Sequence, residues 1–260
     1  MPGIYIHVPF CASKCPYCDF YSVADRGRID NYISAVIDEL STLRRVGPLA
    51  GDLKHRAIAT VYFGGGTPSF LGAENLAALL RAVKKNFNVA PGAEITAECN
   101  PSSSLAPGFF ETLAAAGFNR VSLGMQSAVD AERRKLGRRA TVADVETAVK
   151  ACQSAGITDI SLDIMLGVPE QTERSLLSSL DFALSLGVTH LSAYLLSIEE
   201  SDIIIINASH MDVKVFTGIF CRYIDNTAKP EESINSENVL WFTCYSTLIV
   251  NFAPCGVVEG

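Results

Sequence analysis

Short apolar runs alternate with longer amphipathic stretches along the first 200 residues of the chain. The runs are rich in β-branched and aromatic residues, and such runs favour strands. They predict six strands, at residues 4–8, 58–63, 94–98, 120–125, 159–166 and 190–196.

Between these runs, apolar residues recur at the i, i+3, i+4, i+7 spacing of helices. Two series show this best: Ile33, Val36, Ile37, Leu40 and Leu43, and Leu76, Leu79, Leu80, Val83 and Phe87. Asp30 precedes the first series and is the predicted N-cap. Further helices are predicted at about 108–116, 142–155 and 172–186. A glycine suited to a C-cap follows each of them, at Gly117, Gly156 and Gly187.

Six strand-helix repeats predict an α/β fold with a parallel sheet covered by helices. Periodicity alone leaves a doubly wound sheet and a barrel both open. In either geometry the ligand site lies at the carboxyl ends of the strands. We therefore expect functional residues to follow the strands directly.

Composition limits the class of protein. The chain has 260 residues, 48% of them hydrophobic and 19% charged, which is typical of a globular chain with one large domain, or a domain and a fragment. The net charge of −7 argues against a nucleic-acid partner held by general electrostatics. Met1-Pro2-Gly3 leads straight into the first strand, so no signal or transit peptide is expected.

Three closely spaced cysteines, Cys11, Cys15 and Cys18, directly follow the first predicted strand. Their spacing is C-x3-C-x2-C. A [4Fe–4S] cluster normally takes four Cys ligands, so a set of three would leave one iron open. An open coordination position is typical of a metal centre that does chemistry.

Two other interpretations of these cysteines stay open at this point. Together with His7 they could form a Cys3His zinc site, although zinc ligands usually come as two separated pairs. The thiols could also be free or disulfide-bonded. The other five cysteines, at 99, 152, 221, 244 and 255, are scattered, which does not resemble a secreted disulfide framework and favours a reducing intracellular compartment. Cys99 and Cys152 are predicted to be small buried residues.

The segments Tyr5–Cys11 and Cys15–Phe20 resemble the radical S-adenosylmethionine (SAM) superfamily. More narrowly, they resemble the branch that contains the HemW-type haem chaperones and the oxygen-independent coproporphyrinogen III dehydrogenases. The resemblance implies a partial (β/α)6 barrel, a [4Fe–4S] cluster held by Cys11, Cys15 and Cys18, and SAM bound at the open iron. In that superfamily, an electron from the cluster cleaves SAM to methionine and a 5′-deoxyadenosyl radical.

The resemblance also implies which residues bind SAM. Gly64, Gly65, Gly66 and Thr67 match the glycine-rich segment that hydrogen-bonds the SAM amino group, and glycines at a strand end allow close backbone approach. Glu98 ends the third predicted strand, where a carboxylate can accept two ribose hydroxyl bonds. The remaining positions that match the cofactor pocket are Tyr5, Tyr17, Gln126, Arg138 and Asp163.

The resemblance covers about residues 3–200, so residues 1–200 are predicted to form the radical SAM core, and the tail at 201–260 departs from the family. The tail contains an apolar run from Val239 to Ala253, which is shorter than the roughly 20 residues that span a bilayer. No membrane span is expected. We expect residues 201–260 to be an irregular tail that is absent from the family, and disordered or aberrant, in place of the C-terminal domain that completes the family's substrate or haem site. A retained intron or a frameshifted gene model is our hypothesis for its origin.

Two functions follow from the resemblance. The dehydrogenases carry another Cys two residues after the third ligand, whereas this chain has Phe20 there. We therefore favour a haem chaperone that transfers haem to acceptor proteins over a coproporphyrinogen III dehydrogenase of porphyrin biosynthesis. A shortened, inactive product is the third alternative. The expected location is the cytoplasm, or a mitochondrion or plastid if a transit peptide is missing from the sequence.

Overall fold

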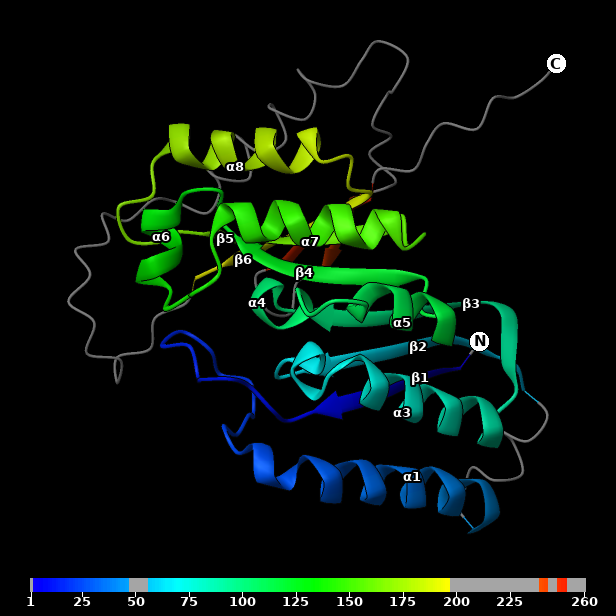
Figure 1. The fold of residues 1–260 in the computed structure, drawn as a ribbon. Coiled ribbons are helices and arrows are strands. Elements are labelled where there is room, and N and C mark those ends of the chain that lie inside the picture. Colours follow the sequence, from blue (N-terminus) through cyan, green and yellow to red (C-terminus); the bar gives the residue numbers. More distant parts are fainter. Residues whose placement is uncertain (1, 47–55, 197–238, 243–246, 252–260) are drawn as a thin grey trace, which may run out of the picture. The chain divides into compact units, whose positions relative to one another are not determined.

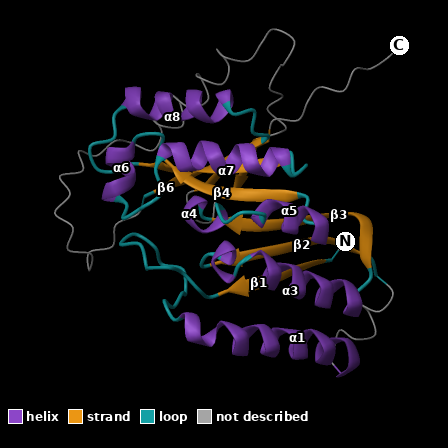
Figure 2. Cartoon of the chain, in the orientation of Figure 1, coloured by secondary structure: helices purple, strands orange, loops and turns teal. Residues whose placement is uncertain are grey.

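A computed structural model describes residues 2–46, 56–196, 239–242 and 247–251 of the chain. The chain divides into two compact units. The first comprises Met1–Gly124 and Ala143–Ile160, and the second comprises Met125–Val142 and Ser161–Gly260. Strands alternate with helices in both units (Figure 2), which confirms the predicted α/β class.

Four strands form the sheet of the first unit, and they lie side by side in chain order (Figure 1). They are β1 (Gly3–Val8), β2 (Ile58–Gly65), β3 (Val89–Cys99) and β4 (Arg120–Gln126). The last two residues of β4 belong to the second unit. All three pairings are parallel. Ile58, Val61 and Phe63 of β2 are fully buried, as expected for a parallel sheet that helices cover.

The helices of the first unit follow the predicted strand-helix alternation. They are α1 (Ile29–Val46), α3 (Ala73–Asn86), α4 (Pro101–Ser104), α5 (Phe109–Ala116) and α7 (Val142–Ser154). The first residue of α7, Val142, belongs to the second unit. Helix α3 packs against α1 and α5. Its predicted apolar stripe is buried at Leu76, Leu79, Leu80 and Val83. Burying each such side chain contributes about 1.5–3 kcal/mol to folding.

The ends of the helices agree with the predictions in part. Gly117 has a φ of 100° and its N–H donates to the carbonyls of Leu113 and Ala114, so the predicted C-cap is confirmed. The prediction that Asp30 is an N-cap is wrong. A 3-10 helix, Arg26–Arg28, precedes α1, and the Asp25 side chain caps it by accepting the Gly27 N–H. Asp30 consequently lies in the first turn of α1.

The second unit contains two helices, α6 (Asp130–Lys135) and α8 (Glu173–Ser185), among its described residues. Its strands are β5 (Asp159–Leu166), β6 (His190–Leu195), β7 (Val239–Phe242) and β8 (Thr247–Asn251). Asp159 and Ile160 belong to the first unit. Strands β5 and β6 pair in parallel, with Ser161 beside His190. Strand β8 pairs antiparallel with both β6 and β7.

Of the predicted tail at 201–260, the structure describes strands β7 and β8 only. Both lie in the apolar run noted in the sequence. Their antiparallel pairing ends the strand-helix alternation of the preceding residues. The rest of the tail lies outside the described residues.

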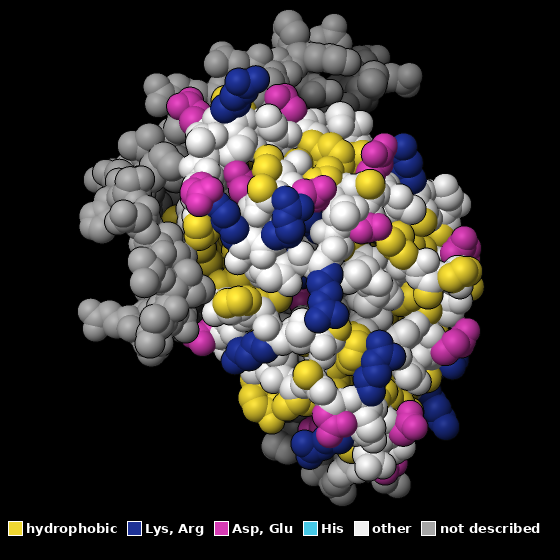
Figure 3. Space-filling model, turned by 60° about the vertical axis from the view of Figure 1, so that its left-hand side comes forward, with side chains coloured by type: hydrophobic (Ala, Val, Ile, Leu, Met, Phe, Trp, Pro, Cys, Tyr) yellow, Lys and Arg dark blue, Asp and Glu magenta, His cyan; other side chains and the backbone are white. Residues whose placement is uncertain are grey.

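The surface charges and the character of the helices both bear on possible partners. Lys and Arg side chains lie interspersed with Asp and Glu on the face shown in Figure 3. Within the described ranges, no helix has the length and apolar character that crossing a bilayer requires.

We expect Leu79→Ala to lower the free energy of unfolding by about 2–5 kcal/mol, because Leu79 is fully buried in α3 and the substitution leaves a cavity. Leu43 of α1 is 43% exposed and serves as the matched control. Leu43→Ala should cost less than about 1 kcal/mol. Urea denaturation followed by circular dichroism measures both, and equal losses would contradict the described packing.

Candidate cluster and cofactor site

The loop that follows β1 is closed at its base by backbone hydrogen bonds. The Cys11 N–H donates to the Val23 carbonyl at 3.1 Å, and the Val23 N–H donates to the Pro9 carbonyl at 2.8 Å. Phe10 and Val23 thereby form a parallel bridge. The three predicted ligand cysteines lie on this loop, at the carboxyl end of β1 (dark blue in Figure 1).

Cys11, Cys15 and Cys18 are partly exposed, and none of them forms a disulfide with another described cysteine. The Cys18 N–H donates to the Cys15 carbonyl at 3.1 Å, which closes a turn around Tyr17. Three thiols on one accessible loop can reach a metal centre without unfolding the core.

Cys99 and Cys152 differ from the loop cysteines, because both are buried. Burial raises the pKa of the Cys152 thiol to about 12 and the pKa of the Cys99 thiol well above its ordinary value. Metal binding requires the thiolate, so these environments disfavour it. The prediction that both are core residues is confirmed.

The glycine-rich segment after β2 is hydrogen-bonded to the cysteine loop. The Gly66 N–H donates to the Val8 carbonyl and the Thr67 N–H donates to the Phe10 carbonyl, both at 2.8 Å. Thr67 Oγ1 lies 3.3 Å from Cys11 Sγ, within hydrogen-bond distance for sulfur. The two predicted segments, far apart in the sequence, therefore form one site.

Gly66 is required by this close approach. A Cβ at Gly66 would lie 2.8 Å from the Phe10 carbonyl oxygen and 2.9 Å from that of Val8. The sequence-based interpretation related all three glycines to a ligand. For Gly66, the structure also gives a reason within the protein, which is the packing of two backbone segments.

The Glu98 carboxylate lies at the carboxyl end of β3, as predicted, and both of its oxygens accept a hydrogen bond. Oε1 accepts the Tyr62 hydroxyl at 2.7 Å and Oε2 accepts the Gly65 N–H at 3.2 Å. Burial raises the pKa of Glu98, whereas these two hydrogen bonds and the nearby His7 lower it. A Cβ at Gly64 would lie 2.7 Å from the Tyr62 ring and 3.0 Å from Oε1, so glycine at 64 leaves room for the pair.

His7 connects the β1 strand to the cysteine loop. Its Nδ1 lies 3.3 Å from the Tyr5 hydroxyl, and its Nε2 lies 3.2 Å from the Tyr21 carbonyl oxygen. Both ring nitrogens thus have partners in the protein, which disfavours the zinc interpretation that used His7 as a ligand. Among the described residues, no group of three His, Cys, Asp or Glu side chains converges on a single ion. In a cubane each cysteine ligates a different iron, so its ligands need not converge on one ion.

The other predicted cofactor residues lie in the second unit. Gln126 ends β4, is buried and has a φ of 69°, a left-handed conformation that is uncommon for a residue other than glycine. The buried Arg133 guanidinium donates to the backbone carbonyls of the two residues that flank Gln126, which are Met125 and Ser127. Asp163 lies in β5 beside Ser192 of β6. Arg138 is partly exposed and follows α6.

Neither Tyr62 nor Arg133 was predicted from the sequence as a residue of the candidate site. Tyr62 bonds Glu98, and Arg133 holds the backbone around Gln126. Tyr62 could have been found, because it lies two residues before Gly64 and the two share a face of β2. Arg133 had no sequence signal, since Arg133, Arg134 and Lys135 form a basic run in which only the fold decides which side chain is buried.

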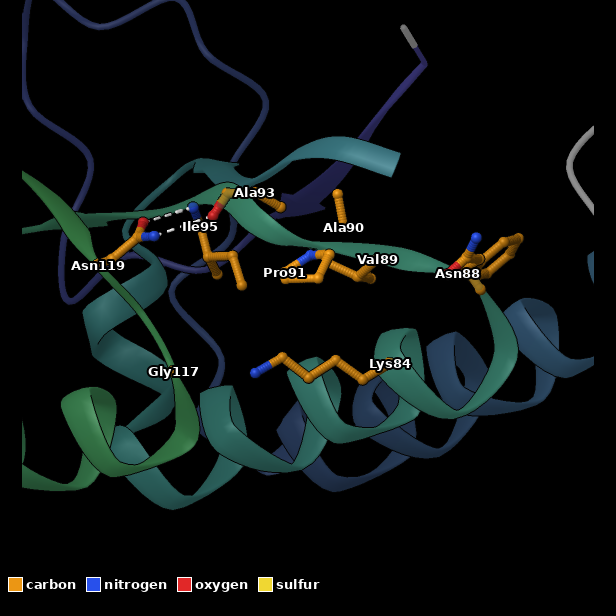
Figure 4. Close-up of a pocket in the computed structure, with 10 residues that line it drawn as sticks. Lys84, Asn88, Val89, Ala90, Pro91, Ala93, Ile95, Gly117 and Asn119 are labelled. Carbon is orange, nitrogen blue, oxygen red and sulfur yellow. Dashed lines mark hydrogen bonds between the residues drawn. The ribbon is translucent and has the colours of Figure 1, made fainter. Parts of the chain in front are cut away.

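A pocket of about 480 Å³ lies elsewhere in the first unit, at the start of β3 (Figure 4). At one end of the pocket, Asn119 accepts the Ile95 N–H and donates to the Ala93 carbonyl. Lys84 donates to the Ala116 carbonyl at 2.8 Å. Ala93 is five residues from Glu98 along β3, or about 16 Å at the usual rise of a strand. This pocket is therefore separate from the cysteine and glycine loops.

The fold and the cysteine loop agree with one class of protein. The family model of the Radical SAM superfamily matches residues 5–183, and the chain belongs to this superfamily. The family implies a [4Fe–4S] cluster and SAM. The described residues fit such a cluster, because they offer three accessible thiols on one loop. They also place the Glu98 carboxylate beside the glycine segment, where a polar cofactor could bind.

The chain is similar to two curated haem chaperones. It is 41% identical over 201 residues to heme chaperone HemW of Mycobacterium tuberculosis, covering 76% of this chain and 50% of that protein. It is 37% identical over 200 residues to HemW of Haemophilus influenzae, covering 76% and 51%. The chain thus spans about half the length of the curated relatives it matches.

Among solved structures, the fold is similar to that of coproporphyrinogen III oxidase (HemN) from Escherichia coli. The TM-score is 0.72 at 22% identity, and the match covers 96% of this chain and 56% of that one. At this identity the likeness concerns the fold alone. It confirms the radical SAM type of α/β fold that the sequence predicted.

We expect Gly66→Ala to disrupt the contact between the glycine segment and the cysteine loop, because the added Cβ would overlap two carbonyl oxygens. Such overpacking costs about 1–3 kcal/mol. Gly92 of β3 is the control, since a Cβ there meets no atom within 4 Å. Thermal melting should show a lower Tm for Gly66→Ala only. A Tm equal to that of Gly92→Ala would contradict the described contact.

Proposed function

We propose that this chain is the radical SAM core of a HemW-like haem chaperone. In this proposal it holds a [4Fe–4S] cluster, binds SAM, and passes haem to an acceptor protein. The observation that carries the proposal is the hydrogen-bonded pairing of the cysteine loop with the glycine segment, directly beside the Glu98 carboxylate.

Cys11, Cys15 and Cys18 are the proposed ligands of the cluster. With three thiolates bound, one iron keeps an open position, at which SAM would bind. The cluster, when bound, supplies electron transfer. The protein contributes a loop whose base is fixed by the bridge between Phe10 and Val23, so ligand binding need order only the residues between them.

The remaining site residues are proposed to bind SAM. Gly65, Gly66 and Thr67 offer backbone close to the cysteine loop, and Glu98 offers carboxylate oxygens to ribose hydroxyls. Tyr5 of β1, whose ring would lie 3.1 Å from a Cβ at Gly64, and Tyr17, between Cys15 and Cys18, belong to the same proposed set. Gln126, Arg138 and Asp163 of the second unit, together with Gly64, complete the proposed set.

The choice of haem chaperone over dehydrogenase is supported by two facts. The curated relatives with 33–41% identity carry the name HemW. Phe20 stands two residues after Cys18, where the resembled dehydrogenases have a fourth cysteine, and its side chain is 63% exposed.

The cluster assignment predicts a loss of iron when a ligand is removed. Cys15→Ser should lower the iron and sulfide content of the anaerobically reconstituted protein to less than about half of the wild-type value, since two thiolates hold a cubane poorly. Cys152→Ala is the control, because Cys152 is buried in α7 and should leave the iron content unchanged. Equal iron in both variants would contradict the assignment.

The function is tested by comparing haem binding with porphyrinogen turnover on the same preparation. We expect a Soret band that saturates at about one haem per chain and no conversion of coproporphyrinogen III in the presence of SAM and a reductant. Turnover would favour the dehydrogenase instead. Neither binding nor turnover, with an intact cluster, would favour the inactive alternative.

A further inference from the structure

We propose that Tyr62 is a positioning residue for SAM, which acts by holding the Glu98 carboxylate in one orientation. The inference rests on the proposed function, because it assigns Glu98 to the ribose of SAM. Tyr62 itself need not touch the cofactor.

The hydrogen-bonding capacity of Glu98 supports this role. An ionised carboxylate has about four lone-pair sites on its two oxygens. The Tyr62 hydroxyl occupies one site on Oε1 and the Gly65 N–H occupies one on Oε2. About two sites are left, which is the number that two ribose hydroxyls require. The protein thus holds each oxygen from one side and keeps one site on each for a ligand.

Tyr62 is itself held in place. It pairs with Tyr5 in the parallel register of β1 and β2, and the two rings stack with centroids 6.0 Å apart and planes 19° apart. Tyr5 in turn contacts His7, whose ring reaches the Tyr21 carbonyl of the cysteine loop. The orientation of Glu98 is thereby coupled to the loop that carries the proposed cluster ligands.

Without the Tyr62 hydroxyl, the Gly65 bond, at 3.2 Å, is the one hydrogen bond to the Glu98 carboxylate that the described residues would still provide. A carboxylate held at one oxygen can rotate, so SAM binding would then have to order it. The titratable groups that interact with Glu98 are Tyr62, His7, Tyr5 and Cys99. Of these, Tyr62 lowers the pKa of Glu98 by donating to the carboxylate, so its loss raises that pKa further.

The test compares Tyr62→Phe with Tyr32→Phe in the reconstituted full chain, by equilibrium binding of SAM. The Tyr32 hydroxyl donates to the His7 carbonyl at 2.6 Å, so the control also loses one tyrosine hydrogen bond in the same unit. We expect the Kd for SAM to rise about tenfold in Tyr62→Phe, since hydrogen bonds to charged groups are the stronger ones, and less than about twofold in Tyr32→Phe.

Two further readouts separate positioning from a structural effect. The loss of SAM binding on acidification should begin at a higher pH in Tyr62→Phe, because a protonated Glu98 accepts fewer hydrogen bonds. In a Glu98→Gln background, Tyr62→Phe should weaken SAM binding by less than about twofold, because the group it orients has changed.

The outcomes distinguish this inference from the proposed function. Wild-type protein with an intact cluster that fails to bind SAM would overturn both. Wild-type binding with an unchanged Kd in Tyr62→Phe would overturn the inference alone. Loss of the cluster in Tyr62→Phe but not in Tyr32→Phe would also overturn it, because Tyr62 would then act on the fold.

Discussion

The site depends on the hydrogen bonds between the segment after β1 and the segment after β2. Gly66 and Thr67 donate to the carbonyls of Val8 and Phe10, and no side chain at position 66 would fit between these segments. This pairing continues the parallel register of β1 and β2 past the end of both strands. It brings the cysteine loop against the glycine segment, and the contact between Cys11 and Thr67 follows from it.

Glu98 shows how the same region prepares for a ligand. Burial disfavours its ionised form, and the hydrogen bonds from Tyr62 and Gly65 oppose that effect. Partial burial of a carboxylate costs free energy that hydrogen bonds, a nearby positive charge or a ligand can offset. Its place at the carboxyl end of β3, beside the glycine segment, agrees with the ligand-binding role that we propose for it.

The strands and most helices could be predicted from the sequence, because apolar periodicity reports burial directly. The Leu76 stripe and the Gly117 cap are examples. The N-cap of α1 was misplaced because a 3-10 turn shifts the start of the chain's first helix to Ile29. The motif residues were found by resemblance. Tyr62 was missed, although its position two residues before Gly64 places both residues on one face of β2; its bond to Glu98 is a contact across the sheet that the motif itself does not include.

The central claim is that the cysteine loop and the glycine segment form one cofactor site. Electron paramagnetic resonance of the anaerobically reconstituted and reduced protein, with and without SAM, tests it most directly. We expect a [4Fe–4S] signal that shifts when SAM is added, because in our proposal SAM would bind at the open iron beside Glu98. A cluster signal indifferent to SAM, or no cluster signal at all, would contradict it.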